Sequence, residues 1–127
     1  MTILQLLEQT IQLEQVLVKL KDHYLTNERP ENKRDPVFFQ FVKEQTSPVF
    51  EQIDHWYKNA LQFIQNREVK VHPQQLQSTE DNLKILLLHS YYIDVRKRRY
   101  MDLYQSIQYV LDSLKQDIKN QTKRGGE

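Results

Sequence analysis

The chain has 127 residues, of which 39% are hydrophobic and 28% charged, and its formal net charge is +1. It contains no cysteine, and its two glycines, Gly125 and Gly126, stand near the C-terminal end. These numbers exclude disulfides, cysteine metal sites and glycine-rich phosphate loops, and they argue against an all-β fold, whose tight hairpins need residues that accept positive φ.

The first predicted helix spans residues 3–25, with Thr2 as its N-cap. Its apolar residues recur at spacings of three and four, which is the pattern of a helix that packs into a bundle. These seam residues are Ile3, Leu6, Leu13, Leu17, Leu20 and Tyr24. A second apolar row widens the apolar arc beyond that seam, and it consists of Leu4, Leu7, Ile11, Val18 and Leu25.

A charged, proline-containing segment follows at residues 27–35, and we expect it to be a solvated loop. Asp35 and Pro36 then supply an N-cap and a first helical residue for a second helix, which should end near residue 66. The seam residues of this helix keep one heptad register throughout. They are Phe39, Val42, Thr46, Val49, Ile53, Trp56, Ala60 and Phe63.

Pro48 stands inside the second predicted helix. Proline lacks the backbone N–H that a helix interior uses, and its ring crowds the preceding turn. We therefore expect the helix to be bent or broken at residues 46–48. A fresh helix that starts at Ser47 and Pro48 is an open alternative.

The third predicted helix spans residues 73–92, and the chain should turn again near residues 94–97. No proline or glycine marks this turn, but the seam changes phase there. The fourth helix carries its seam on Tyr100, Tyr104, Ile107, Leu111, Leu114 and Ile118. One continuous helix over 73–120 would be about 70 Å long, which no other predicted helix could cover.

Four amphipathic helices joined by short connections predict an all-α fold, an up-down-up-down antiparallel four-helix bundle. Residues 1–120 should form this single domain, and residues 121–127 a flexible C-terminal tail. No run of apolar residues approaches the length of about 20 that a spanning helix needs. The N-terminal segment also lacks the basic start of a signal peptide, so we expect a cytoplasmic protein without a membrane segment.

The helix at 73–92 has more apolar surface than a bundle requires, because Ile85, Leu88 and Tyr92 form a row roughly opposite its core side. Our candidate surface for a protein partner, or for a homodimer, joins this row to four residues of the first helix, Leu4, Leu7, Ile11 and Val18. Two alternatives stay open: the third helix could be the most buried of the four, or the segment 36–46 could fold over these rows.

The fourth helix is preceded and opened by a basic run, Arg96, Lys97, Arg98 and Arg99. The simplest interpretation is a solvated turn, and contact with an anion or a nucleic acid is the alternative. The loop at 27–35 lies at the same end of the predicted bundle, so we expect its acidic residues to offset part of this charge. They are Glu28, Glu31 and Asp35.

Three histidines offer an alternative function. His23, His55 and His89 come from three different helices, and in the predicted topology they fall toward the same end of the bundle. One histidine from each of three helices can form an open zinc or nickel site. Scattered surface histidines are the competing interpretation, and we expect no cofactor.

The sequence contains no catalytic set, because it has no Ser-His-Asp signature and neighbouring residues such as Asp54 and His55 point in different directions on a helix. We therefore expect a non-enzymatic protein that binds a protein partner or itself. The metal- or small-ligand-binding bundle is the alternative. Nucleic-acid contact through residues 96–99 ranks below both at a net charge of +1.

Several short segments resemble the YppE-like family of small uncharacterised proteins from Bacillus and related Firmicutes. The resemblance covers roughly residues 36–118 and is weaker in the first helix. Its segments are Val71-His72, Asp81-Asn82-Leu83, Ser90-Tyr91, Arg98-Arg99-Tyr100, the Ser106 to Tyr109 spacing, and Trp56 followed by Ala60-Leu61. It implies an up-and-down four-helix bundle in a cytoplasmic bacterial protein, and it supplies no active-site residues.

Overall fold

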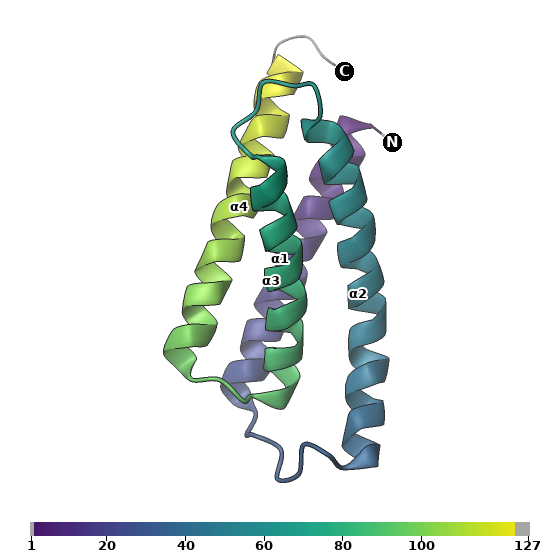
Figure 1. The fold of residues 1–127 in the computed structure, drawn as a ribbon, viewed down its shortest axis with the longest axis vertical. Coiled ribbons are helices and arrows are strands. Elements are labelled where there is room, and N and C mark those ends of the chain that lie inside the picture. Colours follow the sequence, from purple (N-terminus) through teal and green to yellow (C-terminus); the bar gives the residue numbers. More distant parts are fainter. Residues whose placement is uncertain (1, 124–127) are drawn as a thin grey trace.

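The computed structural model describes residues 2–123 and consists of four helices that run up and down beside one another (Figure 1). They are α1 (Ile3–Thr26), α2 (Pro36–Ile64), α3 (Pro73–Tyr92) and α4 (Lys97–Lys123). The predicted four-helix bundle is therefore confirmed. None of these helices is both long and apolar enough to cross a membrane.

Local sequence signals fix where the helices begin. Thr2 and Gln5 form a capping box, in which the Thr2 hydroxyl accepts a hydrogen bond from the Gln5 backbone N–H at 3.1 Å. The Asp35 carboxylate accepts from the Val37 backbone N–H at 3.1 Å, with Pro36 as the first helical residue of α2. The capping signals in the sequence thus identify both helix starts.

Two expected helix boundaries need correction. Helix α2 continues through Pro48 without a break, so a fresh helix does not start at Ser47. Helix α4 continues to Lys123, so residues 121–123 are helical and do not belong to a tail. The rest of the expected tail, residues 124–127, lies outside the described residues.

The four helices are not equivalent in the bundle. Within residues 2–123, α1 and α3 approach each other across the centre, whereas α2 and α4 stand at opposite corners (Figure 1). Most of the seam residues meet in one core. Its largest fully buried side chains include Trp56, Tyr100, Leu17, Leu86, Leu87, Ile107, Leu111 and Leu114.

The turn between α3 and α4 is made without glycine. Ile93 ends α3 in the left-handed region, with φ of 51°, and its backbone N–H donates to the His89 carbonyl at 2.8 Å. A β-branched residue is costly in that region. Neighbouring segments hold the turn: the Arg29 Nε donates to the Ile93 carbonyl at 3.2 Å, and the Tyr24 hydroxyl donates to the Val95 carbonyl at 2.5 Å.

Helix α2 extends past the C-terminal end of its neighbour α3, at the same end of the bundle as the α3–α4 turn (Figure 1). It has 29 residues against 20 in α3, and its first turns project below the end of α3 in Figure 1. Phe39, which the heptad register placed in the core, is 56% exposed, and Val37 and Phe41 are exposed as well. The first turns of α2 meet the end of α3 through Phe38 and Phe41, whose rings contact Tyr92 and Tyr91, so the predicted core position of Phe39 is wrong.

Candidate functional site

The outer face of α3 carries a groove at the end where the loop at residues 27–35 passes. Ile85 is 45% exposed and Leu88 39% exposed, and Tyr92 is half-buried. These three residues line a groove of about 620 Å³ together with Lys33, Arg34, His89 and Asp94. The apolar row predicted on this helix is thus present, and the loop places cationic residues beside it.

Aromatic packing from α2 supports one end of this groove. The rings of Phe38 and Tyr92 meet edge to face, with centroids 5.6 Å apart. Phe38 also lies 6.2 Å from Phe41, whose ring is 6.1 Å from Tyr91. Tyr92 is therefore held by the projecting first turns of α2 and not by the core.

Asp94 links the loop to α3 at the floor of the groove. Its carboxylate accepts a hydrogen bond from His89 Nδ1 at 2.8 Å and pairs with Lys33 Nζ at 3.3 Å. Burial alone would raise the pKa of this carboxyl, but the hydrogen bonds from His89 and Lys33 outweigh it and lower the pKa below 3.8. The aspartate therefore stays ionised at neutral pH and neutralises part of the charge of Lys33.

Replacing Asp94 with asparagine should lower stability at neutral pH and leave it unchanged in strong acid. Because the folded state depresses the pKa of Asp94, its stabilising contribution is present above the unfolded value of 3.8 and is lost as the pH falls through the folded value. Urea unfolding midpoints of the two proteins should differ between about pH 5 and 7 and converge below about pH 3. A difference that is the same at every pH would contradict this account.

The basic run spreads around the start of α4 instead of forming one patch. All four residues are exposed, and successive residues of a helix point about 100° apart. Among them Arg99 lines a second groove, between α3 and α4, with Ile85, His89, Asp102 and other residues. The two grooves share Ile85 and His89 and therefore adjoin each other.

The acidic residues of the loop do not meet this run as expected. Glu28, Glu31 and Asp35 line a separate pocket with Phe38, Phe41 and Tyr91. Within residues 2–123, the ion pair that joins the loop to the α3–α4 turn uses a basic residue of the loop, Lys33, with Asp94. No ion pair within residues 2–123 joins a loop acid to the basic run, so the expected offset does not take the form of direct ion pairs.

The second apolar row, on α1, is only partly exposed. Leu4, Ile11, Val18 and Leu25 are exposed at successive heptad positions. Leu7 instead packs against the core, so this member of the expected row is not available to a partner. The row that remains is narrow, with one exposed apolar residue in every two turns.

The three histidines do not come together as a metal site. His23 Nδ1 hydrogen-bonds the Ser90 carbonyl at 2.9 Å, and its ring contacts the Tyr91 ring at a tilt, with centroids 4.6 Å apart. His55 lies 19 residues beyond Pro36, about 28 Å along an unbroken α2 at 1.5 Å per residue, and so sits far from the end that holds His23 and His89. No group of three or more His, Asp or Glu residues in the described part of the chain could hold a metal ion.

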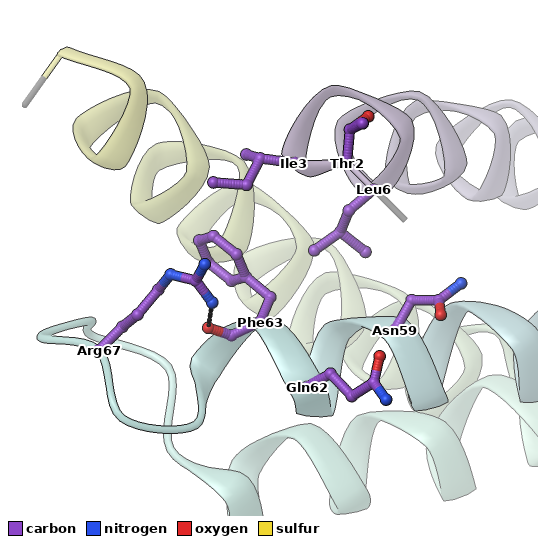
Figure 2. Close-up of a pocket in the computed structure, with 7 residues that line it drawn as sticks. All are labelled: Thr2, Ile3, Leu6, Asn59, Gln62, Phe63 and Arg67. Carbon is purple, nitrogen blue, oxygen red and sulfur yellow. Dashed lines mark hydrogen bonds between the residues drawn. The ribbon is translucent and has the colours of Figure 1, made fainter. Parts of the chain in front are cut away.

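A small pocket of about 100 Å³ at the opposite end of the bundle was not predicted (Figure 2). Arg67 lies over the Phe63 ring at 4.8 Å and donates from Nη1 to the Phe63 carbonyl at 2.6 Å. The other lining residues are Thr2, Ile3, Leu6, Asn59 and Gln62. Arg67 thereby satisfies a carbonyl at the end of α2, which is a structural role.

The fold and the groove define a small up-and-down four-helix bundle with an apolar and basic surface at one end. The chain belongs to the family described as a bacterial domain of unknown function, DUF1798, whose model matches residues 10–118. It is 32% identical over 120 residues to the uncharacterized protein YppE of Bacillus subtilis (strain 168), covering 94% of this chain and 96% of that protein. The predicted membership of the YppE-like family is confirmed.

Two solved structures of Bacillus subtilis YppE share the fold. The crystal structure matches with a TM-score of 0.83 at 30% identity, over 97% of this chain and 99% of that chain. The solution NMR structure matches with a TM-score of 0.72, also at 30% identity, over 95% of this chain and 98% of that one. The similarity therefore reaches into the first helix, where the sequence segments resembled the family least.

Proposed function

We propose that this protein is a cytoplasmic, non-enzymatic module that binds a protein partner through the outer face of α3. The observation that carries the proposal is the exposure of Ile85 and Leu88 in a groove beside Tyr92. Exposed apolar side chains gathered on one face of a folded protein are typical of interaction surfaces. The net charge of +1 gives no general attraction to nucleic acids or anionic membranes.

The packing of α3 favours this face over the others. The opposite side of α3 faces the core, where Leu83, Leu86 and Leu87 are buried. Ile85 and Leu88 are the exposed large apolar residues of this helix and lie outside that buried core. A groove-lining row at positions i, i+3 and i+7 suits an amphipathic helix of a partner.

Replacing Leu88 with glutamate should abolish partner binding while leaving the bundle folded. A charge in the apolar floor of the groove is unfavourable for a docked apolar side chain, whereas Leu88 is already 39% exposed, so the free protein should lose less than about 1 kcal/mol of stability. Affinity purification from the native host with mass spectrometry, using wild type and variant as baits, measures the first effect. Urea unfolding measures the second.

Ser78→Glu on the same helix is a matched control, because Ser78 is exposed and lies outside the groove. Partners captured by wild type and by this control, but not by Leu88→Glu, support the proposal. A partner set that is identical for all three baits shows that binding, if any, uses another surface.

Self-association through α1 is a second candidate, which the exposed heptad row of Leu4, Ile11 and Val18 favours. Light scattering of the purified protein at micromolar concentration distinguishes it from the first. A dimer that Ile11→Glu converts to a monomer would assign the surface to α1. A monomer at all concentrations leaves the α3 face as the remaining proposal.

A further inference from the structure

The charged residues of the loop at 27–35 line two different surfaces, which the sequence does not reveal. Acidic and basic residues are interleaved along the loop. In the fold, Lys33 and Arg34 line the groove on α3, whereas Glu28, Glu31 and Asp35 line the aromatic pocket, and Arg29 donates to the carbonyl of Ile93, which also lines that pocket. The charged loop residues that line the groove are therefore two basic ones.

The opposite edge of the apolar row is also basic. Arg99 lines the adjoining groove between α3 and α4, on the side of Ile85 away from the loop. Ile85 and Leu88 thus lie between the cations of the loop and a cation of α4. The remaining residues of the basic run stand exposed nearby, at the start of the same helix.

The acidic residues within these grooves offset part of this charge. Asp94 pairs with Lys33 Nζ at 3.3 Å, so Lys33 adds little unpaired positive charge. Asp102 lines the α3–α4 groove together with Arg99, but within residues 2–123 neither Arg99 nor Arg34 forms an ion pair, and these two are the unpaired cations beside the row. Arg34, whose backbone N–H is held by Asn32, has its guanidinium available on the loop side of the groove.

We propose that the occupant of this groove is an acidic amphipathic helix of a partner protein, an inference that rests on the docking face proposed above. The row from Ile85 to Tyr92 is about 10 Å long at 1.5 Å per residue, which corresponds to two turns of a docked helix. Apolar residues of that helix would contact Ile85, Leu88 and Tyr92. Its flanking carboxylates would face Arg34 on one side and Arg99 on the other, in the complementary arrangement that selects partners by charge.

Two synthetic helical peptides test this inference directly. Both carry leucine at positions i, i+3, i+4 and i+7, and one has glutamate at the flanking positions where the other has lysine. Fluorescence anisotropy with the full-length protein at low salt should show the acidic peptide binding at least about tenfold more tightly, the ratio that 1.4 kcal/mol represents. Added salt should weaken that preference, since the contacts are solvent-exposed.

A second test reverses two charges on the protein and compares its binding of the same two peptides. Arg34→Glu combined with Arg99→Glu should remove or invert the preference between the two peptides. Lys19→Glu combined with Lys58→Glu changes the net charge equally at exposed positions away from the groove, and it should leave the preference intact. This comparison separates a local effect from the effect of overall charge.

The outcomes separate this inference from the function on which it rests. If both peptides bind equally and Leu88→Glu prevents binding, the acidic partner is wrong and the docking face stands. If neither peptide binds, or if Leu88→Glu has no effect, the docking face itself is wrong. If a single-stranded oligonucleotide binds more tightly than the acidic peptide, the partner belongs to a different class from the one proposed.

Discussion

Replacing Asp117 with alanine should lower the free energy of unfolding by about 1–3 kcal/mol, the range for leaving a buried hydrogen-bond donor unsatisfied. Asp117 is only 3% exposed although it is ionisable. Its carboxylate accepts from the Lys70 backbone N–H at 3.0 and 3.1 Å and from the Val71 backbone N–H at 3.0 Å. Alanine would leave those two donors without this acceptor, and the Val71 N–H is buried.

The loss of stability is expected because Asp117 holds the connection between two other helices. It lies on α4, whereas Lys70 and Val71 belong to the connection between α2 and α3, which contains no glycine. The carboxylate thus replaces the local turn hydrogen bonds that a glycine-based connection would make for itself. Val71 is 1% exposed and belongs to the core, so a connection that loosens would also disturb apolar packing.

Urea unfolding followed by far-UV circular dichroism measures the change. Asp117→Asn keeps one carbonyl oxygen and should lose less stability than alanine. Asp112→Ala is the control, because Asp112 is an exposed aspartate of the same helix and should cost less than about 1 kcal/mol. If the Asp117 and Asp112 variants lose equal stability, the carboxylate does not hold the connection.

The bundle could be predicted because its seams are local in sequence. Residues such as Leu13, Leu17 and Leu20 repeat at the spacing of a helix face, and each such face must be buried. The α3–α4 turn was found in the same way, from the phase of Tyr100 and Tyr104, although Ile93 adopts a left-handed conformation that its side chain disfavours. No local signal identifies Ile93, since contacts from Tyr24 and Arg29 hold it.

Two details of α2 could not be predicted from its sequence pattern. Phe39 keeps the heptad spacing, yet it is exposed, because the first turns of α2 meet the end of α3 through Phe38 and Phe41 instead. Pro48 was expected to bend or break α2, and the helix continues through it without a break.

The candidate site was likewise predicted only in part. The row of Ile85, Leu88 and Tyr92 was visible as a helical periodicity. The contribution of Lys33 and Arg34 was not, because it depends on how an irregular loop crosses the end of α3. Periodicity reports which face a helix residue lies on, but no comparable rule assigns the side of a loop residue.

Replacing Trp56 with alanine should cost about 3–5 kcal/mol, the typical loss when a large buried aromatic is truncated, and should bring the protein close to unfolding. Trp56 is fully buried, and its indole Nε1 donates to the Thr10 hydroxyl at 3.0 Å. That hydroxyl in turn donates to the Leu6 carbonyl at 2.8 Å. Trp56 therefore contributes both apolar area and a polar link between α2 and α1.

Thermal and urea unfolding should be followed by circular dichroism, because this is the chain's one tryptophan and its fluorescence is lost in the variant. Tyr109→Ala, which truncates an exposed aromatic on α4, is the control and should change stability by no more than about 0.5 kcal/mol. A loss of the same size at both positions would mean that the bundle does not depend on burial at Trp56.

A double-mutant cycle separates the two contributions of Trp56. Thr10→Val removes the acceptor and leaves the buried indole N–H unpaired, which should cost about 1–3 kcal/mol when Trp56 is present. In the Trp56→Phe background there is no indole N–H to satisfy, so the same Thr10→Val substitution should cost clearly less. Equal costs in the two backgrounds would show that the hydrogen bond adds nothing beyond packing. Unequal costs would show that one polar pair fixes how α1 and α2 align, and therefore where α2 projects beyond α3 to frame the groove.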